Sequence, residues 1–95
     1  MEDTCRIWTG LYPVVWTNGE GCAVDVMNHL IEQGIKEQDL NLVEPDKRKY
    51  PKCRQVVIQN HKIDDIKRLL ENGNFDMASD LKELISGPHK STYTN

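Results

Sequence analysis

The amino-acid sequence predicts one small α/β domain. Two runs of β-branched residues, at Val14–Trp16 and Gln55–Ile58, are each followed by turn residues and then by a helical pattern of apolar residues. A chain of 95 residues also leaves room for only one modest core. We therefore expect a sheet of three to four strands with about three helices. The domain is expected to span residues 1–88, and a flexible tail to span residues 89–95.

The first strand region is rich in aromatic and β-branched residues. It runs from Ile7 to Trp16 and is interrupted by Gly10 and Pro13. This pattern predicts one or two short strands, of which Val14–Trp16 is the clearer.

A turn and a helix follow this region. Thr17 and Glu20 have the spacing of a capping box, and Gly34 is placed to end the helix. Four apolar residues share one helical face: Ala23, Met27, Leu30 and Ile31.

The second half of the chain continues with alternating strand and helix signals. Asp39–Leu42 predicts a strand, and Gln55–Ile58 predicts another, so the helix between the first strands is expected to connect a parallel pair. Asn60 is a candidate cap for the next helix. The apolar face of that helix contains Ile63, Ile66, Leu69 and Leu70, and that of a final helix, ending at Gly87, contains Phe75, Ala78, Leu81, Leu84 and Ile85.

Composition and charge indicate where the protein is located and which partners it does not bind. The acidic start of the chain lacks the apolar segment of a signal peptide, and no apolar run is long enough to cross a bilayer. We expect a cytoplasmic protein that does not bind membranes. The net charge of −3, with Asp76, Asp80 and Glu83 on the last predicted helix, argues against binding to nucleic acid.

The cysteines indicate neither a disulfide framework nor a zinc site. There are three, without a Cys-x-x-Cys pair and without histidines at ligand spacing, so no metal is expected. Cys22 lies at a predicted helix N-terminus, where unpaired N–H groups and the helix dipole favour a thiolate. The competing interpretation is a small apolar residue packed under the first helical turn.

The segment from Val14 to Ile35 resembles the opening of glutaredoxins, in which a strand and a short loop lead to the active-site cysteine and a helix. The stretch from Gln55 to Phe75 is similar to the second half of that family. This resemblance implies a thioredoxin-like fold with Cys22 at the position of the catalytic cysteine.

The chain departs from that family at the residues that perform its chemistry. Cys22–Asp25 stands where the family has a Cys-Pro-Tyr-Cys or Cys-Gly-Phe-Ser type motif, so no resolving cysteine follows. Arg54 occupies the position of the family's cis-proline, and its Gly-Gly pair is absent between Ile63 and Asp64. The resemblance therefore implies the framework more strongly than the activity, because function depends on the site rather than the fold.

Two groups of residues are candidates for binding. Trp8 and Tyr12, with Trp16, form an aromatic cluster that either fills the core or supplies a protein interface. A basic loop either contacts an acidic partner or is simply solvated; its residues are Lys47, Arg48, Lys49, Tyr50, Lys52 and Arg54.

The sequence thus leaves two functions open. The first is a small non-catalytic protein-interaction module, such as a viral or accessory adaptor or inhibitor, on a degenerate thioredoxin-like fold and without a cofactor. The second is a monothiol glutaredoxin-like oxidoreductase in which Cys22 attacks a glutathione mixed disulfide and the basic loop holds glutathione carboxylates. We prefer the first, because the second requires several lost parts to be replaced.

Overall fold

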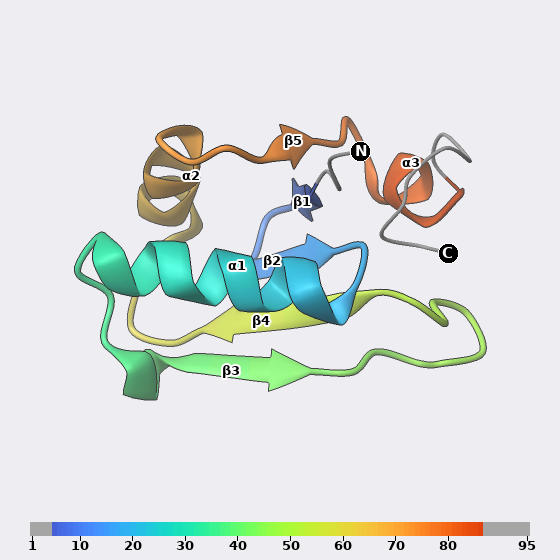
Figure 1. Cartoon of the computed structure of the whole chain (residues 1–95), viewed down its shortest axis with the longest axis horizontal. Helices are drawn as coiled ribbons and strands as arrows, with labels where there is room; N and C mark the ends of the chain where they lie inside the picture. Colours follow the sequence, from blue (N-terminus) through green and yellow to red (C-terminus); the bar gives the residue numbers. More distant parts are fainter. Residues whose placement is uncertain (1–4, 87–95) are drawn as a thin grey trace.

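The chain forms a five-stranded sheet with helices on both faces, as the computed structural model of residues 5–86 shows (Figure 1). The strand order is β3-β4-β2-β1-β5. The elements in chain order are β1 (Arg6–Thr9), β2 (Val14–Thr17), α1 (Glu20–Glu32), a 3₁₀ turn (Glu37–Asp39), β3 (Leu40–Val43), β4 (Arg54–Ile58), α2 (Ile63–Glu71), β5 (Asp76–Met77) and α3 (Leu81–Ser86).

The α/β class is confirmed, but the expected strand number and strand pairing are wrong. The sheet has five strands rather than three to four. β2 and β3, which flank α1, run in the same direction but are not neighbours, because β4 lies between them and pairs antiparallel with both. In a direct parallel pair β3 would lie beside β2, but β4 takes that position and β3 pairs on its other side.

The fifth strand comes from a segment that we expected to be helical. Phe75–Ala78 does not continue the last helix; β5 instead pairs in parallel with β1, and the N–H of Ala78 donates to the carbonyl of Ile7 at 2.8 Å. Periodicity could not reveal this strand, since two residues are too few to show an alternation.

Two side-chain hydrogen bonds cap the start of α3. The carboxylate of Asp80 accepts the N–H of Glu83 at 2.7 Å, and the carboxylate of Glu83 accepts the N–H of Ser79 at 2.8 Å. These two bonds satisfy N–H groups at and just before the helix start. The predicted boundary at residue 88, the predicted tail at residues 89–95 and the side chain of Ile85 lie outside the described part of the structure.

The N-caps of α1 and α2 differ from those that the sequence predicts. The expected capping box is wrong: Gly19 is the N-cap of α1 and makes no side-chain cap bond, while the Thr17 hydroxyl lies 2.9 Å from the Gly19 carbonyl and 3.0 Å from that of Arg54. Asn60 is not a cap either, since α2 has Lys62 at its N-cap.

The end of α1 is as predicted. Gly34 has a φ of 106°, and the N–H groups of Gly34 and Ile35 donate to the carbonyls of Ile31 and Leu30, both at 3.0 Å. This is the Schellman arrangement, which favours glycine at the residue with positive φ.

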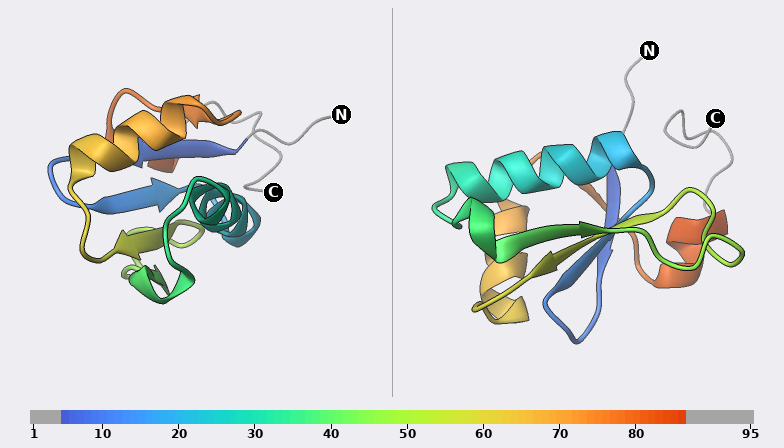
Figure 2. Two further views of the ribbon diagram at one scale, coloured as in Figure 1. Left: turned by 90° about the vertical axis from the view of Figure 1, so that its left-hand side faces the viewer. Right: turned by 90° about the horizontal axis from the view of Figure 1, so that it is seen from below.

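The main core lies between the sheet and the helices α1 and α2. Its contacts include Cys22, Val26 and Leu30 from α1 packed against Ile7 and Val15 from the sheet. Ile31 was expected on the buried face but is 40% exposed. Figure 2 shows α1 on one side of the sheet and α3 on the other. None of the described helices is both long enough and apolar enough to span a bilayer.

Candidate functional site

Two tryptophans are paired on the face of the sheet opposite α1. The register of β1 and β2 places Trp8 directly opposite Trp16. Side chains alternate along a strand, so the adjacent residues Ile7 and Val15 point to the main core and the two indoles point away from it. Sheet pairing therefore positions both rings together.

A second, small core covers one part of this face. Cys53, Ala78 and Leu84 are buried there, and both tryptophans pack against them. The ring of Tyr50 contacts Trp16 edge to face, with centroids 4.9 Å apart and an interplanar angle of 72°. These residues pack against the Trp16 ring, and they leave another part of the face open as a pocket.

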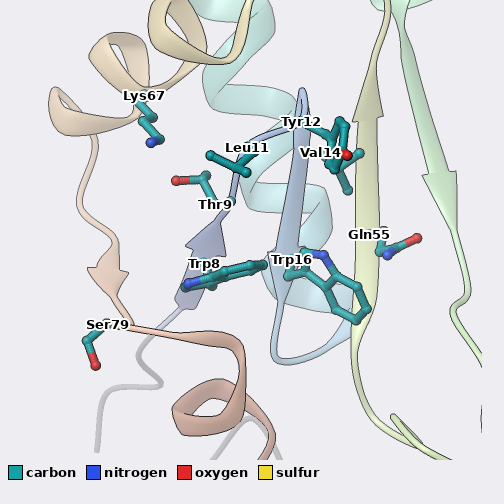
Figure 3. Close-up of a pocket in the computed structure, with 10 residues that line it drawn as sticks. Trp8, Thr9, Leu11, Tyr12, Val14, Trp16, Gln55, Lys67 and Ser79 are labelled. Carbon is teal, nitrogen blue, oxygen red and sulfur yellow. The ribbon is translucent and has the colours of Figure 1, made fainter.

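An open pocket of about 780 Å³ occupies the uncovered part (Figure 3). We call it the aromatic pocket. Its volume falls within the range of small-molecule sites. It is lined by Trp8, Thr9, Gly10, Leu11, Tyr12, Val14, Trp16, Gln55, Lys67 and Ser79.

The tip of the β1–β2 hairpin supplies the exposed rim of the aromatic pocket. Leu11 is 86% exposed and Tyr12 is 73% exposed, which makes them the two most exposed large apolar side chains of the described residues. Gly10 precedes them, and a Cβ atom there would lie 2.7 Å from the Trp8 ring. The absence of a side chain at Gly10 therefore lets the indole lie close to the backbone of the turn.

One cation lies at the rim of the aromatic pocket. Lys67 is on α2, and its ammonium end points toward Thr9 and Leu11 (Figure 3). Within the described part of the chain, no acidic side chain lies within 4 Å of this ammonium group. The other residues that line the pocket carry no charge at neutral pH.

The predicted basic loop does not line the pocket as a group. Its exposed lysines and Arg48 connect β3 to β4, and Lys47 pairs with Glu44 at 3.3 Å. Arg54 is in β4, half-buried, and its guanidinium lies 3.6 Å from the same carboxylate. Tyr50 is the member of this loop that reaches the tryptophans.

Cys22 is joined to Cys5 by a disulfide, with 17 residues of sequence separation and a Cα–Cα distance of 4.9 Å. The sequence predicts no disulfide framework, and this one disulfide between two of the three cysteines corrects that expectation. Cys22 does lie in the first turn of α1, as predicted, but its side chain is 0% exposed within the main core. Its partner precedes β1, and only the pairing of β1 with β2 brings the two together.

The histidines of the described chain have structural contacts. The Nε2 atom of His61 lies 3.3 Å from a carboxylate oxygen of the buried Asp39, and Asn60 donates to the other oxygen at 3.1 Å. His29 Nε2 lies 2.8 Å from the carbonyl of Leu69. In residues 5–86 no group of three or more His, Cys, Asp or Glu side chains is arranged to hold a metal ion.

Comparison of the chain with protein-family models, with curated proteins and with solved structures finds no match. The site must therefore be interpreted from its own geometry. Of the predicted binding residues, the structure brings Trp8 and Tyr12 into one pocket and leaves the basic loop outside it. Sequence reasoning missed Leu11, whose position in a hairpin turn was the available signal, and Lys67, which gives no signal in sequence because helix α2 places it there.

Proposed function

We propose that this chain is a protein-interaction module, an adaptor or inhibitor without catalytic activity, that binds its partner through the aromatic pocket. The observation that carries the proposal is the exposure of Leu11 and Tyr12 beside a floor formed by Trp8 and Trp16. Leaving such side chains in water costs free energy that a partner would recover by covering them. Aromatic side chains in desolvated pockets also contribute most to the energy of protein interfaces.

The polar groups of the pocket favour binding over catalysis. Thr9, Gln55, Lys67 and Ser79 come from four different segments and lie at separate parts of the rim (Figure 3). A catalytic site needs a nucleophile or base oriented by a second group at hydrogen-bond distance. Their separation suits the polar rim of an interface, where such groups fix orientation.

A thioredoxin-like origin of this module remains a proposal based on sequence resemblance. Its support is local: β2, the following loop and α1 form the expected strand–loop–helix with Cys22 in the first turn, and β4 leads into α2. The strand order, in which β4 separates β2 from β3, lends it no support. The interaction proposal does not depend on this origin.

A glutathione-dependent oxidoreductase is the competing function. It would require the Cys22 sulfur to reach a glutathione sulfur, and this sulfur is fully buried and already bonded to Cys5. The residues around Cys22 therefore do not fit glutathione in this state. Turnover of a glutathione mixed disulfide by the intact protein, lost in Cys22→Ala and retained in pocket variants, would establish this function in place of the interaction module.

The interaction proposal can be tested with the fluorescence of the chain itself. Both tryptophans of the sequence line the aromatic pocket, so their emission reports its occupancy. Peptides would be selected from a random display library on the wild-type chain and then titrated against it. We expect the selected peptides to shift the emission, and the double variant Leu11→Ser, Tyr12→Ser to weaken binding about tenfold or more, as interface anchors do.

Ile31→Ser is the matched control, because Ile31 is an exposed apolar residue on α1, away from the pocket. It should leave the affinity unchanged within about twofold, which is the range of surface contacts outside an interface. The proposal fails if the selected peptides bind the hairpin-tip variant as well as the wild type, or if only the Ile31 variant weakens binding.

A further inference from the structure

We infer that the aromatic pocket takes an acidic peptide segment, in which a large apolar side chain enters between the tryptophans and a neighbouring aspartate or glutamate side chain pairs with Lys67. This inference rests on the proposed function and specifies the chemistry of the partner. It is carried by the placement of one cation, without an ion pair among the described residues, at the rim of an apolar pocket.

The described residues that line the pocket carry one charge, opposite in sign to the net charge of the chain. The chain carries a net charge of −3, yet Lys67 alone among the described lining residues is ionised at neutral pH. Lys67 makes no ion pair with a described residue, whereas the carboxylate of Asp76, for example, pairs with Arg6 at 2.9 Å. A ligand carboxylate at this rim would therefore meet a cation without having to displace an internal partner.

The apolar part of the pocket strengthens that pairing. The indoles and the hairpin tip would exclude water once a ligand covers them, and charges attract more strongly where water is reduced. Lys67 also has a long flexible stem, so its ammonium group can follow a carboxylate on a ligand that is anchored over the tryptophans. The apolar anchor and the acidic residue must therefore be close together in the ligand.

The carboxylate is assigned to a side chain rather than to a chain terminus. Terminal carboxylates are typically held by nests of backbone N–H groups. Here the cation is a single side chain on a helix, and near the hairpin tip the N–H of Val14 is already used by the carbonyl of Tyr12 at 2.6 Å. A lone flexible lysine suits an aspartate or glutamate side chain within a segment.

The surface fits single-stranded nucleic acid less well. Stacking aromatics with a lysine are found in such sites, but affinity for a phosphate backbone grows with the number of cations that follow it. One lysine lines the pocket, and the lysines and arginine of the β3–β4 loop are not part of the lining.

The test compares peptides that differ only in charge. The probe is an acetylated and amidated peptide, Gly-Asp-Phe-Leu-Asp-Gly, titrated against the full chain with tryptophan emission and amide NMR shifts as readouts. The first comparison peptide has Asn in place of both Asp residues, and a second has Lys there. A third is the Asn peptide with a free C-terminal carboxylate, and a single-stranded oligonucleotide is the nucleic-acid probe.

We expect the Asp peptide to bind about fivefold more tightly than the Asn peptide at low salt, as for a favourable partly exposed ion pair, and the difference to shrink as salt is added. Lys67→Gln should abolish the difference, and Lys67→Glu should make the Lys peptide the tighter ligand. Lys36→Gln is the matched control: it removes the same charge from an exposed residue beyond the end of α1 and should preserve the preference.

The inference is overturned if the Asp and Asn peptides bind wild type equally, or if the preference survives Lys67→Gln. It is also overturned if neither peptide binds, if the free C-terminal carboxylate gives the larger gain, or if the oligonucleotide binds more tightly than the Asp peptide. In the first two cases, binding that still requires Leu11 and Tyr12 would leave the interaction module itself intact. If binding does not require Leu11 and Tyr12 either, both the acidic-peptide inference and the interaction module are contradicted.

Discussion

Cys53 is the clearest case in which the environment of a single residue determines its chemistry. It is a free cysteine, buried with Ala78 and Leu84 beneath the two tryptophans. Burial raises the pKa of its thiol above the ordinary value of 9.0, because an apolar environment disfavours the thiolate, and the nearby charge of Arg54 offsets only part of that effect.

We predict that Cys53 is slow to react with alkylating reagents in the native protein, since its thiolate is disfavoured and inaccessible. Alkylation measured against pH should have a higher midpoint in the native chain than in the urea-unfolded chain. Because the pKa is raised in the folded state, stability is fully present below the unfolded thiol pKa and falls as pH rises through the folded value. The Cys53→Ser variant should take up no label before reduction; fast native labelling at an ordinary midpoint would contradict this assignment.

At the scale of elements, the end of α1 depends on one backbone conformation. Gly34 has a φ of 106°, and a Cβ atom built there would meet no heavy atom within 4 Å. A side chain at this position would therefore be disfavoured by backbone strain and not by a clash. The two hydrogen bonds of the Schellman turn are donated by the N–H groups of Gly34 and Ile35. They direct the chain from α1 toward β3.

We predict that Gly34→Ala lowers the free energy of unfolding by about 1 kcal/mol, the usual cost of a positive φ for a residue with a Cβ atom. Gly34→Asn should cost less, because asparagine tolerates this conformation better. Both changes can be measured by urea denaturation followed by circular dichroism. Equal stability of the wild type and the alanine variant would mean that the helix ends differently in solution.

For the whole molecule, the Cys5–Cys22 disulfide is the feature that most changes the interpretation of the sequence. It joins the residue before β1 to the first turn of α1 and lies within the main core. Disulfides are typical of oxidising compartments and rare in the cytosol. The cytoplasmic location therefore remains a prediction from the sequence, and the disulfide is the observation that it must accommodate.

We predict that reducing this disulfide lowers the free energy of unfolding by about 3 kcal/mol, the usual effect for a closed loop of this length. The measurement is urea denaturation of the Cys53→Ser protein with and without a thiol reductant, so that no third cysteine can exchange with the pair. Adding Cys5→Ala and Cys22→Ala to that protein gives the control, in which the reductant should have no effect. Identical midpoints for the disulfide-containing protein with and without reductant would show that the bond does not form or does not stabilise the fold.

The sequence by itself determined the local elements of this protein. The strand at Val14–Thr17, the strand at Arg54–Ile58 and the end of α1 at Gly34 follow from β-branched runs and from a glycine, which act over a few residues. Trp8 and Tyr12 could also be named as binding candidates from the sequence, because aromatic residues are common in interfaces.

Only the tertiary structure decided how these elements meet. The insertion of β4 between β2 and β3, the pairing of β5 with β1 and the bond between Cys5 and Cys22 all join residues far apart in the chain. The same is true of Lys67, which α2 places at the rim of the aromatic pocket. Contacts of this kind depend on which strands pair and which faces become covered, and no pattern within a short segment specifies that choice.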